Sequence, residues 1–164
     1  MSDNIIELFE RVQKVPYYCL EHRDYEKMFK LKKGSCWEKN IWLGKELRKH
    51  GIKVKFYLIE FDWFTLPVPK DIFELRKHVG HHIALKAKIG GKWIWIDPTW
   101  DPPLAKAGFP VTINWNGKNN TKLAVKPIKM KLIKPKDKIT IKTNQEFFNA
   151  INSYLDRIRK DGKK

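Results

Sequence analysis

Residues 33–40 read KGSCWEKN, and this stretch marks the start of a helix that carries a cysteine at its first position. Ser35 followed three residues later by Glu38 is the capping-box pattern, which predicts Ser35 as the N-cap and Cys36 as the first helical residue. Small and apolar residues then recur at helical spacing up to a glycine that ends the pattern, at Trp37, Ile41, Gly44, Leu47 and Gly51. We therefore expect a helix from Cys36 to about His50.

Cys36 would stand at the positive end of that helix, where the first backbone N–H groups lack partners within the helix. This setting stabilises a thiolate, which is the nucleophilic form of the side chain. A free cysteine is most commonly a buried structural residue, which is the alternative role for Cys36. Cys19 has no comparable setting, and we expect it to pack in the interior.

A predicted hairpin supplies two more reactive side chains. Residues 82–89 (HIALKAKI) and 92–97 (KWIWID) alternate as strands do, and Gly90-Gly91 between them is a two-residue hairpin signal. In that register Asp97 lies opposite Ala84, which shares a strand face with His82. His82 and Asp97 become diagonal neighbours on one face, within reach of each other, whereas His81 points to the other face.

A cysteine at a helix start with a histidine and an aspartate on adjacent strands is the arrangement of a thiol acyl-transfer site. Cys36 would attack a carbonyl carbon, His82 would accept the proton, and Asp97 would fix the orientation and tautomer of the imidazole. The alternatives are that His82 is an ordinary hydrogen-bonded histidine and that Asp97 starts a turn before Pro98.

The same residues resemble a known family. Gly34-x-Cys36 opening a helix, the helix end at residues 50–52 (HGI), His82, and residues 91–99 (GKWIWIDPT) are similar to the transglutaminase-like core, the circularly permuted relative of papain-type thiol proteases. The resemblance covers roughly residues 33–100, with weaker support to about Val125, and the Trp-x-x-x-Asp-Pro-Thr end is its most specific piece. It implies an α+β fold in which the nucleophile helix packs on an antiparallel sheet.

The resemblance also implies a function. Cys36, His82 and Asp97 would be nucleophile, base and orienting residue of a thiol-dependent amide hydrolase or acyl transferase, which forms a thioester and needs no cofactor. The substrate would be a peptide, a protein or a small amide. A peptidase or amidase is favoured over a cross-linking enzyme, because nothing here resembles the extra domains of dedicated cross-linkers. The alternative is an inactive copy that serves as a binding module, with a basic surface for nucleic acid or an acidic partner.

Four tryptophans are candidate substrate contacts, with core packing as the alternative for each: Trp37, Trp63, Trp93 and Trp95. The excursion over residues 62–81, which contains Trp63, is a candidate lid, or else an ordinary connection. The histidines at positions 78, 81 and 82 lack an accompanying carboxylate or cysteine at ligand spacing, so we expect no metal site.

Composition limits the class of protein. A chain of 164 residues with 42% hydrophobic and 13% aromatic residues predicts one globular domain spanning residues 1–164. Lys and Arg number 34 against 18 Asp and Glu, which gives a net charge of +16 that attracts polyanions. Because no zinc-finger, helix-turn-helix or RNA-recognition pattern accompanies this charge, we expect any nucleic-acid binding to be weak and non-specific.

The location of the protein is also predicted from the sequence. No apolar run is long enough to cross a bilayer, and the first residues do not pair a basic stretch with an apolar one, so we expect neither membrane insertion nor a secretory signal. Two cysteines form neither a disulfide framework nor a zinc motif. The prediction is a reducing, cytoplasmic environment, which suits a reactive thiol.

The remaining elements follow from local patterns. We expect a helix over residues 3–13, an irregular stretch or short helix over 14–33, a strand over 52–61, a short helix over 71–77 and two or three strands within 111–142. Thr143 and Glu146 form a second capping box, which predicts a final helix through Arg159.

Overall fold

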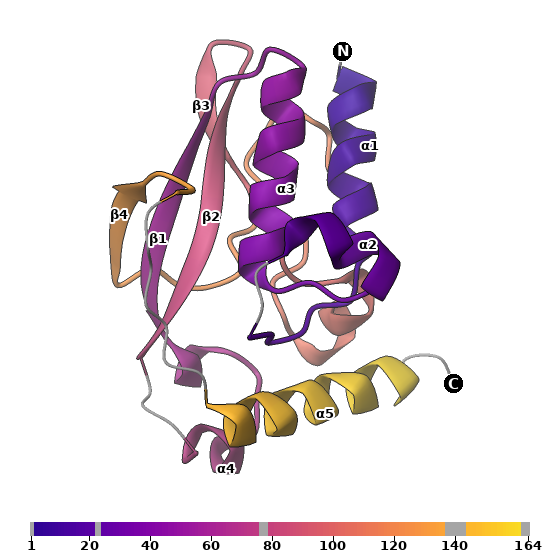
Figure 1. The fold of residues 1–164 in the computed structure, drawn as a ribbon, viewed down its shortest axis with the longest axis vertical. Helices are drawn as coiled ribbons and strands as arrows, with labels where there is room; N and C mark the ends of the chain where they lie inside the picture. The colour runs from indigo at the N-terminus through magenta and orange to yellow at the C-terminus, as the bar shows by residue number, and fades with distance from the viewer. Residues whose placement is uncertain (1, 22–23, 76–78, 137–143, 162–164) are drawn as a thin grey trace.

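The computed structural model describes residues 2–21, 24–75, 79–136 and 144–161, and it shows helices packed on an antiparallel sheet (Figure 1). The helices are α1 (Ser2–Gln13), α2 (Met28–Leu31), α3 (Cys36–Lys49), α4 (Lys70–Phe73) and α5 (Gln145–Asp161). The strands are β1 (Val54–Asp62), β2 (Val79–Ile89), β3 (Lys92–Ile96) and β4 (Lys129–Ile133). Three 3-10 turns complete the list: η1 (Tyr25–Lys27), η2 (Trp63–Thr65) and η3 (Pro102–Ala107). The predicted α+β class is confirmed.

The four strands form one sheet in the order β3-β2-β1-β4, with every neighbouring pair antiparallel. The predicted hairpin register is confirmed, because Ile89 pairs with Lys92 and Lys86 with Trp95. Gly90 and Gly91 both have positive φ, at 57° and 81°, as a two-residue turn that matches the strand twist requires. This register is what sets the face on which each strand residue lies.

One face of the sheet is covered by α3, with α1 lying beside it (Figure 1). Alternate residues of β1 and β2 on this face join α3 in one hydrophobic cluster, among them Phe56, Ile83, Leu85, Ile41 and Leu47. The helix comes very close to β1 at Gly44, where an added Cβ would lie 2.3 Å from Cζ of Phe56. A glycine is therefore required at this position for α3 to sit against the strand.

A second hydrophobic cluster lies at the other end of the molecule, where α5 packs with α4, η2 and η3 (Figure 1). Phe147, Ile151 and Leu155 of α5 are fully buried in it, as their helical spacing predicts. A buried ion pair ties the same helix to the loop after β3, since Arg159 donates from Nε to Asp101 Oδ2 over 2.7 Å and from Nη2 to Asp101 Oδ1 over 2.8 Å.

The C-terminal half differs from the sequence prediction in its strands. Among the described residues between 111 and 136, one strand forms, β4, and not the two or three that were predicted. Much of this stretch instead runs as a loop that bonds the edge of β3, where Thr121 N–H donates to the Trp95 carbonyl. The predicted cap Thr143 lies outside the described residues, and Asn144 Oδ1 accepts from the Phe147 N–H at the start of α5.

The excursion between β1 and β2 contains the predicted short helix, here α4, although it ends at Phe73. The rest of its predicted length, to Lys77, reaches beyond the described residues. In the part of the chain that the structure describes, no helix has the length and apolar character needed to span a membrane.

Candidate active site

Cys36 occupies the first position of α3, as predicted. The capping box is complete, because Ser35 Oγ accepts from the Glu38 N–H and the Glu38 carboxylate accepts from the Ser35 N–H at 3.2 Å. Ser35 and Glu38 are both buried, so the entry to the helix is rigidly held. Cys36 itself is partly exposed, whereas Cys19 is buried in the core as expected. The thiol is therefore accessible at the positive end of a well-formed helix.

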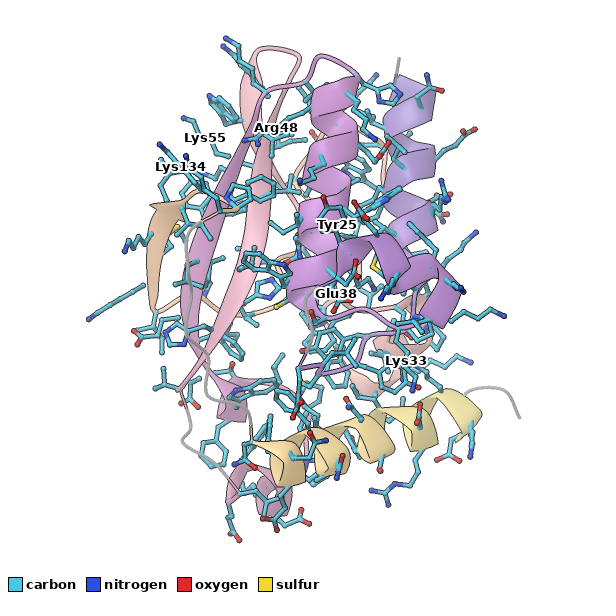
Figure 2. All side chains as sticks on the ribbon, viewed as in Figure 1. Tyr25, Lys33, Glu38, Arg48, Lys55 and Lys134 are labelled. Atoms are coloured by element: carbon cyan, nitrogen blue, oxygen red, sulfur yellow. The ribbon has the colours of Figure 1, made fainter. Side chains whose placement is uncertain are left out.

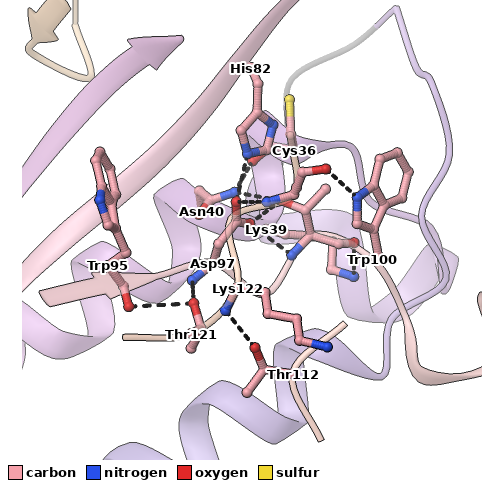
Figure 3. A network of polar contacts seen from close by, with 12 residues as sticks. Cys36, Lys39, Asn40, His82, Trp95, Asp97, Trp100, Thr112, Thr121 and Lys122 are labelled. Atoms are coloured by element: carbon pink, nitrogen blue, oxygen red, sulfur yellow. Dashed lines mark hydrogen bonds and ion pairs between the residues drawn. The ribbon is translucent and has the colours of Figure 1, made fainter. Parts of the chain in front are cut away.

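His82 lies on β2 and is 3% exposed. Its Nε2 is 2.8 Å from Oδ2 of Asp97 (Figure 3), and the Cys36 side chain lies close enough to contribute to the raised pKa of His82. Since Nε2 faces the carboxylate, Nδ1 is the ring nitrogen left for the thiol. His81 is exposed and, by strand alternation, points to the opposite face of the sheet. The prediction that His82 and not His81 meets Asp97 is confirmed.

Asp97 follows β3 directly and is the most fully bonded group of the site. Oδ2 accepts from His82 and from the Ala124 N–H at 2.9 Å, and Oδ1 accepts from the Thr99 N–H at 3.1 Å and from the Thr99 hydroxyl. Its own N–H donates to Thr121 Oγ1 at 2.8 Å. A buried carboxylate with this many donors remains ionised and keeps one orientation.

The electrostatics of the pair favour an imidazolium. Burial by itself lowers the pKa of His82, but the Asp97 charge and hydrogen bonds to Asp97 and Cys36 outweigh it and raise the pKa to about 10. Burial likewise raises the pKa of Asp97, but the His82 charge and hydrogen bonds from His82, Thr99 and the Ala124 N–H lower it below its ordinary value. At neutral pH a proton therefore resides on His82, next to the thiol.

Sequence patterns missed the residues that support the triad. Asn40, one turn after Cys36, donates from Nδ2 to the Cys36 carbonyl over 2.9 Å and to Thr99 Oγ1 over 3.1 Å. The Thr99 hydroxyl in turn donates to Asp97 Oδ1. The side chains of Asn40 and Thr99 therefore connect α3 to the carboxylate (Figure 3). The only signal in the sequence was Thr99 in the Asp-Pro-Thr motif, and nothing marked Asn40 or Thr121.

Lys39 is a second unpredicted feature near the candidate site. It is completely buried, and its Nζ donates to three backbone carbonyls, those of Gln13 at 3.1 Å, Val15 at 2.7 Å and Thr99 at 2.7 Å. Burial lowers the pKa of Lys39 to about 7, against the opposing charges of Asp101 and Asp97. The side chain thereby connects α3 to the end of α1 and to the segment that follows Asp97.

The four candidate substrate-contacting tryptophans are in different surroundings. Trp95 is half-buried on the Asp97 face of the sheet, with its ring centroid 5.1 Å from that of Tyr57 and 4.7 Å from Lys86 Nζ. Trp93 lies further along the same face, and its ring centroid is 4.2 Å from Lys55 Nζ. Trp37 packs against the hydrophobic cluster that α3 forms with β1 and β2. Trp63 is 5% exposed and packs among core aromatic rings, as the alternative of core packing expected.

The candidate metal ligands of the sequence were also compared with the structure. Within the described ranges, no group of three or more His, Cys, Asp or Glu side chains is arranged to hold a metal ion. Of the three histidines considered as ligands, position 78 lies outside those ranges, while His81 and His82 point to opposite faces of β2.

Cys36, which is partly exposed, thus lies beside His82, and His82 is hydrogen-bonded to the buried carboxylate of Asp97. Comparison of the chain with models of known protein families gives no match. Comparison with curated proteins also gives no match.

Proposed function

We propose that this protein is a thiol-dependent amide hydrolase or acyl transferase, with Cys36 as nucleophile, His82 as acid and base, and Asp97 as the residue that orients the imidazole. One observation carries the proposal: His82 is hydrogen-bonded to the buried Asp97 and lies beside Cys36, the first residue of a capped helix. An accessible thiol paired with an imidazolium is the resting form of a thiol nucleophile.

The chemistry would proceed in two halves. The Cys36 sulfur attacks the amide carbon, forming a C–S bond, while the developing oxyanion accepts a hydrogen bond from the Cys36 N–H at the helix start. His82 then gives its proton to the departing amine as the C–N bond breaks, which leaves a thioester. Water or an acceptor amine attacks the thioester, His82 takes the proton from it, and the thiolate leaves.

The transglutaminase-like superfamily, related to papain-type enzymes, is the proposed family. Support comes from the order of the parts: a cysteine opening α3, then a histidine on β2 and an aspartate directly after the antiparallel neighbour β3. A peptide, protein or small amide is the proposed substrate, and a peptidase or amidase remains the favoured reaction.

The experiment is selective alkylation followed by turnover. Iodoacetamide at neutral pH is expected to label Cys36 stoichiometrically and to leave the buried Cys19 unlabelled. Cys19→Ala is the matched control, and it should label like the unchanged chain. A panel of peptide and amide substrates then tests turnover, which Cys36→Ala should abolish. Turnover that persists in Cys36→Ala with Cys19 blocked would disprove the assignment.

A second candidate function rests on a separate basic groove. This groove has a volume of about 800 Å³ and is lined by Lys45, Arg48, Lys55, Lys134 and Lys136, together with apolar residues and no carboxylate side chain among its described lining residues. Figure 2 labels Arg48, Lys55 and Lys134 close together beside β1. An inactive copy acting as a binding module would use such a groove for nucleic acid or an acidic partner.

Oligonucleotide titration separates the two functions. For the enzyme we expect weak binding that falls steeply with salt, because counterion release supplies it. Substituting Lys55, Lys134 and Lys136 by Ala should reduce it about as much as substituting Lys14, Lys30 and Lys126, which are exposed outside the groove. Sequence-dependent binding that survives about 0.2 M salt and is lost only in the groove variant would favour the binding module.

A further inference from the structure

A cavity lies at the end of α3 opposite to Cys36. Its volume is about 520 Å³, within the range of roughly 300–1,000 Å³ that is usual for small-molecule sites. The β2–β3 turn, the first turn of α1, the residues that follow α3 and the loop around Gly117 contribute to its wall. The 14 residues of α3 span about 21 Å at 1.5 Å per residue, so the cavity is separate from the thiol.

The cavity combines an apolar interior with a cationic rim. Ile5, Ile52 and Ile89 line it, of which Ile5 is buried and the other two are half-buried. Lys88, Lys92 and Lys118 also line it, and all three are exposed.

The charges around this cavity are almost all positive. His50 lines it as well, and no Asp or Glu is among its described lining residues. Glu7, which is exposed, lines a neighbouring hollow that shares Asn4 and His50 with the cavity. The three lysines on the hairpin and the 118 loop therefore line the cavity without an acidic residue among its described lining residues.

We infer that this cavity binds a small organic anion with an apolar body, of the kind represented by a medium-chain carboxylate. The isoleucines remove the apolar body from water, and the lysines bind the anionic head. Neither part is sufficient alone, since surface lysines by themselves hold small anions weakly and the isoleucine surface does not distinguish a neutral chain from an acid. The inference does not depend on the function proposed for Cys36.

The test uses octanoate as the probe and amide NMR of the whole chain as the readout. Octanoate is expected to shift the amide signals of Gly90 and Gly117, which line the cavity, and to leave those of Gly44 and Gly108, which do not. Acetate supplies the charge without the chain, and 1-octanol supplies the chain without the charge. Each should bind at least about tenfold more weakly than octanoate, the effect of losing one charge-assisted contact or several buried methylene groups.

Matched lysine variants complete the test. Substituting Lys88, Lys92 and Lys118 by Ala should weaken octanoate binding about tenfold or more. Substituting Lys14, Lys30 and Lys126 by Ala removes the same net charge outside the cavity and should leave the affinity within about twofold. Equal weakening in the two variants, equal affinity for 1-octanol, or unchanged signals of Gly90 and Gly117 would each overturn the inference.

Discussion

The polar side chains at the two ends of α3 differ in burial. At its N-terminal end Ser35, Glu38, Lys39 and Asn40 are all buried, and they bond to one another or to neighbouring segments. At its C-terminal end Arg48 and Lys49 are exposed. Burial of a polar group is costly unless partners replace water. The comparison therefore indicates that the buried polar contacts of the helix are concentrated at the end that carries the thiol.

The difference arises from what packs against each end. The N-terminal end of α3 contacts the segment that follows β3, whose Thr99 offers both a carbonyl and a hydroxyl. The C-terminal end approaches the hairpin turn and the cavity, which are rich in lysine. We therefore expect substitutions of polar residues to have large effects at the N-terminal end of α3 and small effects at its C-terminal end.

The largest expected effect is that of Lys39→Met. The substitution leaves three buried carbonyls without a donor, at about 1–3 kcal/mol each, so we expect the free energy of unfolding to fall by about 3 kcal/mol or more. Lys45→Met, an exposed position on the same helix, is the matched control and should cost under about 1 kcal/mol. Urea denaturation measures both. Similar losses at the two positions would remove the contrast between the ends of α3.

An intermediate effect is expected for the two adjacent histidines. His82→Ala should slow alkylation of Cys36 at neutral pH at least about tenfold, because the imidazolium that stabilises the thiolate is lost. His81→Ala should leave the rate unchanged, since this side chain is exposed on the other face. Rates come from mass-spectrometric quantification of iodoacetamide adducts. Equal slowing by the two substitutions would mean that the His82–Asp97 contact does not control the thiol.

The smallest effect concerns pH. Because the folded-state pKa of His82 lies near 10, above its ordinary 6.5, its stabilising contribution is complete below about pH 6.5 and is lost as pH rises toward 10. Both variants carry Cys36→Ala, so the comparison of Cys36→Ala with Cys36→Ala/His82→Gln isolates the histidine. The stability difference between these two variants should shrink by about 1 kcal/mol between pH 7 and pH 8. Denaturation at a series of pH values measures it, and a constant difference would contradict the raised pKa.

Local patterns in the sequence were sufficient to place Cys36 at a helix start and His82 beside Asp97, because each of these placements obeys a short-range rule. The capping box fixes the first residue of α3, and the Gly90-Gly91 turn fixes the register that brings His82 to Asp97. Patterns were insufficient between residues 111 and 136, where alternating Lys and apolar residues read as several strands. Much of that stretch is instead a loop, which bonds to the edge of β3 where the Thr121 N–H donates to the Trp95 carbonyl. Alternation of residues cannot indicate whether a partner strand is available.

By itself, then, the sequence determined the helix that begins at Cys36, the hairpin and the face on which His82 lies, since these depend on residues a few positions apart. Only the tertiary structure decided how the site is supported and isolated. Thr121 and Ala124 bond to Asp97 from 24 and 27 residues away, and Lys39 bonds to Thr99 from 60 residues away. The physical reason is that a buried polar group must find its partners wherever the packed chain brings them, and no local periodicity records that distance.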